Sequence, residues 1–216
     1  MIAKIELKGV RPRAFDGMDI GPSEIWDKEI SLEHGQSYLV EAASGRGKTS
    51  LCAYLYGQRS DYHGQIVMRD ATGQTVDLRR HIDKVRQTSL AMMPQELRVF
   101  GELTPVENVM LKAQLTHYAT EQEVRDMLVR LGLGERLGQP CSRISTGQQQ
   151  RVAFVRMLVQ PADFCLLDEP VSHLDANNAE TMRQMLAEKQ QREGCGVVVT
   201  TIGHTLPYDY DLRMKL

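Results

Sequence analysis

The chain has 216 residues, of which 42% are hydrophobic and 25% charged, and its formal net charge is −2. This composition is typical of one globular domain, or of one domain with an inserted lobe, and excludes an intrinsically disordered chain. The sequence contains no basic stripe or polybasic run, which argues against a general nucleic-acid-binding protein. The N-terminus lacks the features of a signal peptide, and no apolar run approaches the roughly 18–20 residues of a membrane span. If the protein serves a membrane, we expect another chain to supply the span.

Strands and turns are expected at the beginning of the chain. Residues 2–8 alternate apolar and polar side chains as an edge-type strand does, and residues 30–44 indicate a strand, a turn and a more buried strand. A glycine-rich turn then leads into a helix that begins near Lys48. Two further strands are expected at 64–70 and 88–95.

The middle of the chain is expected to form a helical lobe over residues 96–154, inserted into a core of residues 1–95 and 155–216. Two capping boxes mark helix starts in the lobe, one at Thr104 with proline at the first helical position and one at Thr120. Apolar residues at helical spacing follow each capping box.

The last third of the chain alternates helices with buried strands. Residues 164–170 are apolar and end in carboxylates, which is typical of a strand in a parallel sheet. A helix is expected from about Asp175 to Gln191, followed by a buried strand at 196–204. This alternation predicts an α/β fold with a mainly parallel sheet.

The four cysteines form neither a CxxC pair nor a Cys/His cluster with zinc spacing. We expect free, buried thiols, as in a reducing cytoplasm. These cysteines are Cys52, Cys141, Cys165 and Cys195.

A phosphate-binding loop is predicted at AASGRGKT, which fits GxxxxGK[ST] except that Ala42 replaces the first glycine. Gly45 and Gly47 would let the backbone curl until successive N–H groups point at phosphate oxygens, and the following helix would add its positive N-terminal end. The alternative is a chance glycine turn before a helix, but the loop lies between a predicted strand and a predicted helix, which is the required setting. The expected nucleotide-binding residues are Ala42, Ala43, Ser44, Gly45, Arg46, Gly47, Lys48, Thr49 and Ser50.

Specific roles follow from the side chains of this loop and of the acidic strand. Lys48 would reach the β- and γ-phosphates, and the Thr49 hydroxyl would ligate Mg²⁺. Ligands of parallel sheets bind at the carboxyl ends of strands, so Asp168 would reach the Mg²⁺ shell. Glu169 would face the γ-phosphate and orient or deprotonate the attacking water. Two solvated surface acids at a strand end are the alternative.

A GTPase is a further possibility because residues 70–73 happen to fit DxxG. No Asn-Lys-x-Asp segment that could read guanine follows anywhere in the chain. We interpret residues 70–73 as a turn between strands.

Taken together, the motifs resemble the ATP-binding cassette (ABC) family over nearly the whole chain. The family's elements occur in the family's order, and an ordered set is far more specific than any single motif. They are a phosphate loop, a glutamine at the junction with the helical lobe, a signature turn, an acidic strand, a segment at the dimer seam and a late histidine. The matching segments are AASGRGKTS, Gln95 in MMPQE, ISTGQQQR, LLDEP, Ser172-His173-Leu174-Asp175 and His204.

The resemblance implies a P-loop NTPase fold with an N-terminal antiparallel β subdomain beside the mainly parallel central sheet. It implies that Gln95 senses Mg²⁺ and water and that His204 contacts the γ-phosphate, although His204 lies further beyond its strand than is common. Asp175 would lie at the dimer seam and also cap its own helix. Phe15 is preferred for stacking on adenine over Trp26, because Trp26 lies beside a strand pattern and is expected in the core.

The signature segment RISTGQQQRVAF is locally a helix start with Ser145 as its cap. In the family it binds the γ-phosphate of an ATP held by a second copy, which implies contacts from Ser145, Gly147 and Gln148. Thr146 stands where the family usually has glycine, as Ala42 does in the phosphate loop. We expect function to survive both departures.

The resemblance implies the ATP-hydrolysing subunit of an ABC transporter, with ATP and Mg²⁺ as cofactors. Two copies would face head to tail, and the pair would drive an integral membrane permease from the cytoplasmic face of the cell membrane. TPVENVMLKAQL and the signature helix resemble lipoprotein-releasing and macrolide-exporter cassettes, with the cell-division cassette close by.

Two other classes are weaker. Non-transport ABC proteins of DNA repair, chromosome organisation or translation carry coiled-coil insertions or two fused cassettes, and a nucleic-acid partner would favour a basic surface that this chain lacks. A binding module that no longer hydrolyses ATP is disfavoured by the intact Lys48, Asp168 and Glu169.

Overall fold

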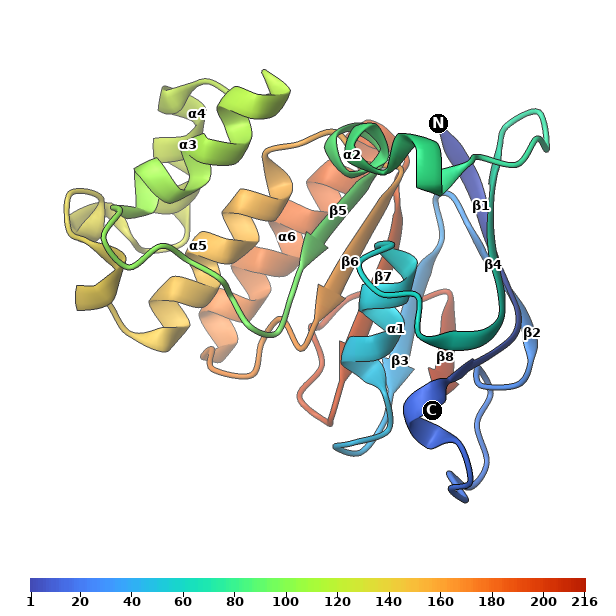
Figure 1. Ribbon diagram of the computed structural model, residues 1–216. Helices are drawn as coiled ribbons and strands as arrows, with labels where there is room; N and C mark the ends of the chain where they lie inside the picture. The colour runs from blue at the N-terminus through green and yellow to red at the C-terminus, as the bar shows by residue number, and fades with distance from the viewer.

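Two sheets form the framework of the protein. A computed structural model describes residues 1–216, except for the side chain of Arg79. All neighbouring strands of the central sheet are parallel, and those of the second sheet are antiparallel (Figure 1). The predicted α/β class is therefore confirmed. The central sheet has the order β5 (Leu90–Met93), β6 (Phe164–Asp168), β7 (Gly196–Thr201), β3 (Ser37–Glu41) and β8 (Leu212–Lys215), and the second sheet has the order β2 (Glu29–Glu33), β1 (Ile2–Pro12) and β4 (Tyr62–Asp70).

The central sheet is buried on both faces. On β6, Cys165 and Leu167 belong to one core cluster, while Phe164 and Leu166 belong to the other. A strand covered on both faces has no polar side to present, which explains its unbroken apolar sequence. Helices α5 (Thr146–Leu158) and α6 (Ala176–Glu193) cover one face, and α1 (Lys48–Leu55) lies between the other face and the antiparallel sheet (Figure 1).

The expectation of an edge strand at the N-terminus was wrong. β1 is the central strand of the antiparallel sheet, with Leu7 opposite Ile30 on β2 and Ile66 on β4. Its alternation arises because one face packs against α1, with Ile5 and Leu7 fully buried. Alternation of apolar and polar side chains indicates that one face of a strand is buried, but it does not indicate whether one or both edges of the strand pair with neighbours.

The helical lobe follows β5 and packs against α5. Helices α3 (Pro105–Thr116) and α4 (Glu121–Arg130) contact α5 and each other at the end of the molecule away from the antiparallel sheet (Figure 1). Both predicted capping boxes are present, and hydrogen bonds from the Thr104 and Thr120 backbones hold the pKa values of Glu107 and Glu123 below their ordinary value. The predicted lobe limit at residue 154 falls inside α5, so the division into lobe and core stays a prediction about folding units.

Two elements were not expected from the sequence. Helix α2 (Leu78–Thr88) is rich in charged residues, and its apolar positions Leu78, Ile82 and Val85 alone carry the helical spacing. Strand β8 has only four residues and extends the sheet by pairing with β3. The DxxG-like residues 70–73 form the predicted turn, closed by a hydrogen bond from Gly73 N to Asp70 O, but the chain then continues into α2 and not directly into a strand.

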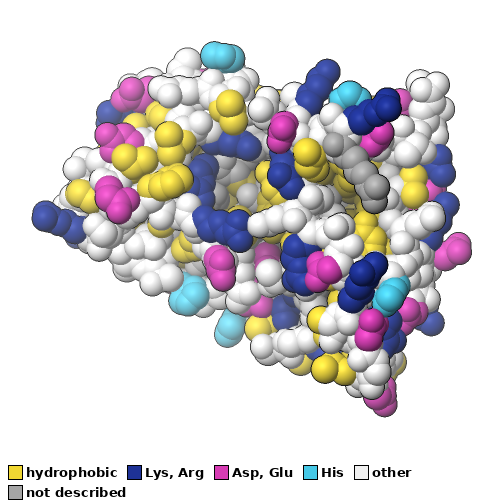
Figure 2. Space-filling model, viewed as in Figure 1, with side chains coloured by type: hydrophobic (Ala, Val, Ile, Leu, Met, Phe, Trp, Pro, Cys, Tyr) yellow, Lys and Arg dark blue, Asp and Glu magenta, His cyan; other side chains and the backbone are white. Residues whose placement is uncertain are grey.

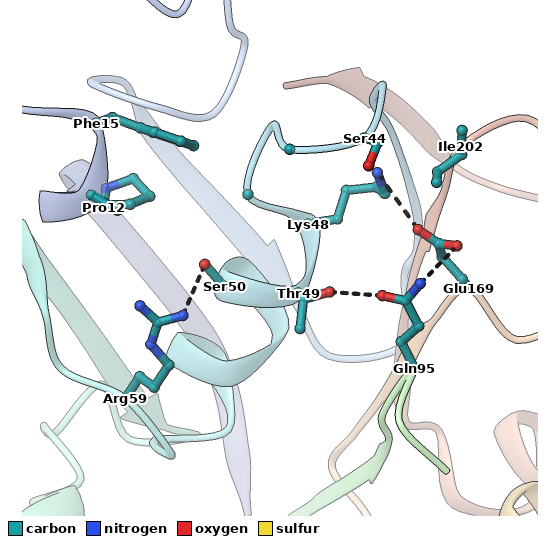
Figure 3. A pocket seen from close by; sticks show the side chains of 13 residues that line it. Pro12, Phe15, Ser44, Lys48, Thr49, Ser50, Arg59, Gln95, Glu169 and Ile202 are labelled. Carbon is teal, nitrogen blue, oxygen red and sulfur yellow. Dashed lines mark hydrogen bonds and ion pairs between the residues drawn. The ribbon is translucent and has the colours of Figure 1, made fainter. Parts of the chain in front are cut away.

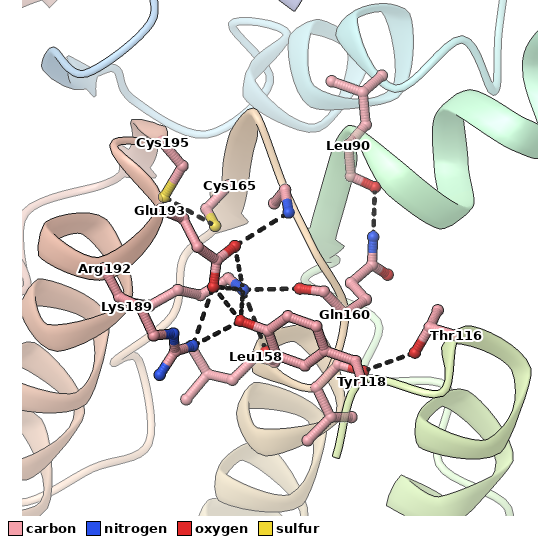
Figure 4. A network of polar contacts seen from close by, with 12 residues as sticks. Leu90, Thr116, Tyr118, Leu158, Gln160, Cys165, Lys189, Arg192, Glu193 and Cys195 are labelled. Carbon is pink, nitrogen blue, oxygen red and sulfur yellow. Dashed lines mark hydrogen bonds and ion pairs between the residues drawn. The ribbon is translucent and has the colours of Figure 1, made fainter. Parts of the chain in front are cut away.

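A buried polar cluster joins the end of α6 to the lobe (Figure 4). Lys189 Nζ lies 2.8 Å from the carboxylate of Glu193 and donates to the backbone carbonyls of Leu158 and Gln160. Burial raises the pKa of Glu193, but hydrogen bonds from Lys189 and Tyr118 outweigh it and leave the pKa below its ordinary value. The buried ammonium therefore has the partners that its burial requires.

The four cysteines are free and buried, as predicted. Burial raises the pKa of Cys141 to about 11 and that of Cys52 well above its ordinary value. These thiols therefore stay protonated at neutral pH. Among the helices of the described residues, we find none with the length and apolar composition needed to cross a bilayer.

Candidate nucleotide site

A cleft of about 340 Å³ opens where α1 begins (Figure 3). Residues from distant parts of the chain line it, among them Phe15 after β1, the glycine-rich loop before α1, Gln95 after β5 and Glu169 after β6. The glycine-rich loop, Gln95 and Glu169 each follow a strand of the central sheet, and the carboxyl ends of parallel strands meet at one edge. The fold thus brings together residues that the sequence separates by more than a hundred positions.

The glycine-rich loop has the backbone that phosphate binding requires. Gly45 and Gly47 have φ values of 78° and 92°, in the left-handed region that favours glycine. A side chain at residue 47 would also meet Trp26 at 3.0 Å and Phe15 at 3.3 Å. Ala42 is not among the described residues with positive φ, so its methyl group fits the loop without backbone strain.

Lys48 is the first residue of α1 and is only 5% exposed. Its ammonium donates hydrogen bonds to the carbonyls of Ala42 and Ala43 at 3.0 and 2.9 Å and lies 3.6 Å from the carboxylate of Glu169. A positive charge is therefore fixed at the helix start that lines the cleft, where the helix dipole also favours an anion.

A chain of hydrogen bonds crosses the cleft. Thr49 Oγ1 donates to Gln95 Oε1 at 3.2 Å, and Gln95 Nε2 donates to Glu169 Oε2 at 3.3 Å (Figure 3). Gln95 therefore links the phosphate loop to the acidic strand. Its predicted role in sensing Mg²⁺ and water stays a prediction.

Asp168 is buried at the end of β6. Its Oδ1 accepts a hydrogen bond from Thr200, while Oδ2 is buried and has no hydrogen-bond partner among the described residues. A buried carboxylate oxygen without a donor suits a cation. Asp168 does not itself line the cleft, whereas Thr49 and Gln95 do. Carboxylate, hydroxyl and amide oxygens are the donor types that Mg²⁺ prefers, and the predicted Mg²⁺ site of these three residues stays a prediction.

His204 lies in a second hollow of about 550 Å³, next to the first. Glu169 and Ile202 line both hollows, and Ser172, Thr201 and Gly203 also line the second. His204 and Glu169 therefore line the same hollow, and the His204 backbone carbonyl accepts a hydrogen bond from Thr201 Oγ1 at 2.8 Å. The predicted contact of His204 with the γ-phosphate stays a prediction.

The two candidate aromatic residues have different environments. Trp26 is 2% exposed, and its indole N–H donates to the carbonyl of Arg46 at 3.0 Å, so its predicted place in the core is confirmed. Phe15 is half-buried and lines the cleft. Its stacking on adenine stays a prediction.

The signature turn is not part of this cleft. Ser145, Gly147 and Gln148 do not line it; Ser145 and Gln148 instead form a capping box at the start of α5. Asp175 is also outside the cleft and caps α6, and the hydrogen bond from Asn178 lowers its pKa. Both local capping roles are therefore confirmed, and the intermolecular roles need a second chain.

Sequence reasoning missed Arg59 and Gln150. Arg59 lines the cleft and donates to Ser50 Oγ at 3.2 Å, so Ser50 has an arginine partner at the site where it would contact phosphate. Nothing in the local pattern around Arg59 marks it, because it follows the helix and enters the cleft only through the tertiary fold. Gln150 is buried, and its contacts involve the backbone of Glu169.

Comparison with known proteins gives a consistent result. The sequence model of the family described as "ABC transporter" matches residues 27–172. The phosphonates import ATP-binding protein PhnC of Stutzerimonas stutzeri is 31% identical, over 89% of this chain and 74% of its own length. The lipoprotein-releasing system ATP-binding protein LolD of Idiomarina loihiensis is 30% identical, over 81% of this chain and 78% of its own length.

Larger and more distant proteins extend the comparison. The macrolide export ATP-binding/permease protein MacB of Shewanella sp. (strain ANA-3) is 30% identical over 88% of this chain, which corresponds to only 29% of MacB. The solved ATP-binding cassette MJ0796, a dimer in a post-hydrolysis state bound to ADP and Pi, superposes with a TM-score of 0.74 and 22% identity, over 91% of this chain and 87% of its own. The fold is thus that of a P-loop cassette, and the sequence matches show that the chain belongs to the ABC transporter family as one of its ATP-binding, ATP-hydrolysing cassettes.

Proposed function

We propose that this cassette works as a head-to-tail homodimer that encloses two ATP molecules and drives a separate membrane permease. The observation that carries the proposal is that the cleft lacks the predicted phosphate-binding turn at Ser145. The phosphate loop, Gln95 and Glu169 line it together, whereas the predicted phosphate-binding turn at Ser145 lies elsewhere in the same chain. A second copy would supply that turn, and the related cassette MJ0796 was solved as a dimer.

Each residue around the cleft would then have a defined role. Lys48 and the N-terminus of α1 would bind the β- and γ-phosphates, and Glu169 would orient the attacking water and accept its proton. Thr49, Gln95 and Asp168 would hold Mg²⁺, which when bound neutralises charge on the phosphates. The remaining nucleotide contacts would come from Ala42, Ala43, Ser44, Gly45, Arg46, Gly47 and Ser50, with Phe15 at the adenine and His204 at the γ-phosphate.

The partner subunit would contribute the first turn of α5. Ser145, the Gly147 N–H and the helix N-terminus form an anion-binding end, and Gln148 and Asp175 would lie at the seam. Thr146 is the first residue of α5 and is exposed, so its side chain is compatible with the helix.

Mixing two inactive variants tests the shared site. Lys48→Ala should disable the phosphate loop and Ser145→Arg the opposing turn, so neither homodimer should hydrolyse ATP. An equal mixture should recover about a quarter of wild-type activity, because half of the dimers are mixed and each has one intact site of two. Phosphate release measured as a function of mixing ratio checks this. If the mixture shows no more activity than the two variants measured separately, each chain does not borrow its partner's turn.

The permease proposal is supported by a groove next to the lobe. The groove has a volume of about 260 Å³. Phe100, two residues after the groove residue Arg98, and Leu111 on α3 do not line the groove but are exposed apolar side chains. Figure 2 shows Lys and Arg side chains between the lobe and the central sheet and hydrophobic side chains over α3 and α4. A mixed apolar and basic groove suits an amphipathic helix of a membrane partner. The groove is lined by Tyr56, Gln58, Arg86, Met92, Pro94 and Arg98.

The relatives indicate which transporter types to consider. LolD is named for lipoprotein release and MacB for macrolide export, and we propose the same general type here, with the cassette held peripherally at the cytoplasmic face of the membrane. The substrate would be selected by the permease.

Co-purification tests the permease proposal. The tagged wild-type protein should retain an integral membrane protein from detergent-solubilised membranes of the source cells, and Phe100→Asp should reduce that retention about tenfold, because it places a charge in an apolar contact. Leu212→Asp is the matched control, since Leu212 is 48% exposed against 53% for Phe100 and lies on β8, at the opposite edge of the central sheet from β5. Recovery of soluble proteins only would count against the transporter role.

A further inference from the structure

Glu169 has an unusual backbone conformation. Its φ is 52°, in the left-handed region that residues other than glycine rarely adopt. Such a conformation persists only where the surroundings fix it, and it is often found at functional sites. The Glu169 N–H donates to Thr200 O at 3.0 Å, and its carbonyl accepts a hydrogen bond from Gln150 Nε2 at 3.1 Å. Two groups therefore hold the peptide units on either side of the carboxylate, and Gln150 is one of them.

Both polar atoms of the Gln150 side-chain amide form hydrogen bonds to one segment of the chain, residues 169–173. Besides the Glu169 carbonyl, Nε2 donates to Ser172 Oγ at 3.3 Å, and Oε1 accepts from the His173 N–H at 3.3 Å. The side chain is 2% exposed, so water cannot replace a lost partner. Gln150 thus fastens residues 169–173 to α5.

The start of α5 is packed against the same segment. A side-chain carbon at Gly147 would lie 2.6 Å from the carbonyl oxygen of His173, a distance that no real contact allows. Gly147 therefore lets two backbones touch, in addition to its predicted phosphate contact. The first turn of α5 and the segment after β6 are consequently joined at two points, one turn apart on the helix.

We propose that Gln150 is a positioning residue for ATP hydrolysis. It holds Glu169 in its left-handed conformation and couples that conformation to the turn of α5 that carries Ser145. When this turn contacts the phosphate of an ATP held by the second chain, the contact would influence the position of Glu169 in this chain. The inference rests on the proposed role of Glu169, and Gln150 itself lies outside the lining of the nucleotide cleft.

A pair of glutamine variants tests this proposal. Gln150→Met keeps length and bulk but removes the donor to Glu169, so kcat for ATP should fall about 10- to 100-fold, as displacement of a reacting group by about 1 Å does. The KM for ATP should stay within about twofold of wild type, because no nucleotide contact is lost. Gln160→Met is the matched control: Gln160 is also 2% exposed, and its Nε2 also donates two hydrogen bonds, but to the carbonyls of Arg86 on α2 and Leu90 at the start of β5, away from Glu169. It should lower the melting temperature similarly and leave kcat within about twofold.

A pH profile gives a second measurement that does not depend on the methionine variant folding. In Gln150→Glu the carboxylic acid can donate to the Glu169 carbonyl only while protonated, and burial raises the pKa of such a group. The ratio of variant to wild-type kcat should therefore fall as the pH rises from 6 to 8.5, by about tenfold.

The proposal is overturned if Gln150→Met and Gln160→Met change kcat equally, or if the Gln150→Glu ratio does not vary with pH. Failure of the wider functional proposal looks different. If Glu169→Gln hydrolyses ATP normally, the assignment of the carboxylate is wrong. If Glu169→Gln is inactive while Gln150→Met is fully active, only the positioning role fails.

Discussion

Replacing Glu169 with glutamine should slow ATP hydrolysis about 10²- to 10⁴-fold, the usual contribution of a general base, and should leave ATP binding intact. The glutamine has the same size and can still bond to Gln95, but it cannot accept a proton from water. It also removes a negative charge located 3.6 Å from Lys48, next to the expected position of the γ-phosphate. ATP should therefore remain uncleaved between two closed subunits, and a stable dimer should accumulate.

Phosphate release in the steady state and size-exclusion chromatography with Mg²⁺ and ATP measure both effects. Glu180→Gln is the control, because Glu180 lies on α6, has Arg183 as its partner and lies outside the cleft. Normal hydrolysis by Glu169→Gln would assign the chemistry to another group. Loss of hydrolysis without a longer-lived dimer would separate the role of Glu169 as base from the proposed ATP-driven closure.

Replacing Lys48 with alanine should abolish detectable hydrolysis and weaken ATP binding about 10- to 100-fold, since a hydrogen bond to a charged group contributes about 1.5–3 kcal/mol. Two effects add up. The cleft loses the cation expected at the β- and γ-phosphates, and the carbonyls of Ala42 and Ala43 lose their donor, which loosens the loop itself.

Titration with a fluorescent ATP analogue measures the affinity, and Lys84→Ala is the control because Lys84 is an exposed residue of α2 outside the cleft. The loss of ATP affinity in Lys48→Ala should exceed the loss that high salt causes in the wild type, because salt screens a buried cation less than a surface one. Unchanged affinity in Lys48→Ala would mean that the nucleotide does not bind along the start of α1.

Short-range features of this protein could be read from the sequence because their physics is local. A glycine turn before a helix has a backbone that depends mainly on its own residues, so AASGRGKT indicated a curled loop, and Gly45 and Gly47 have positive φ values. The predicted capping boxes at Thr104 and Thr120 and the predicted cap at Ser145 depend on atoms within four residues of each other, and all three are present. The apolar run before Asp168 indicated a strand covered on both faces.

Contacts between distant segments were decided only by the tertiary structure. The pairing of β1 on both edges and the addition of β8 to β3 depend on partners far away in the sequence. Helical spacing marks Gln150 only as a position on α5; that its amide holds the left-handed backbone of Glu169 follows from how α5 packs beside β6. The order of motifs was thus sufficient to predict the family and the phosphate loop. What fixes the Glu169 carboxylate in place, and the position of the signature turn outside the cleft, had to come from packing, because hydrogen bonds between distant segments leave no periodic signal in the chain.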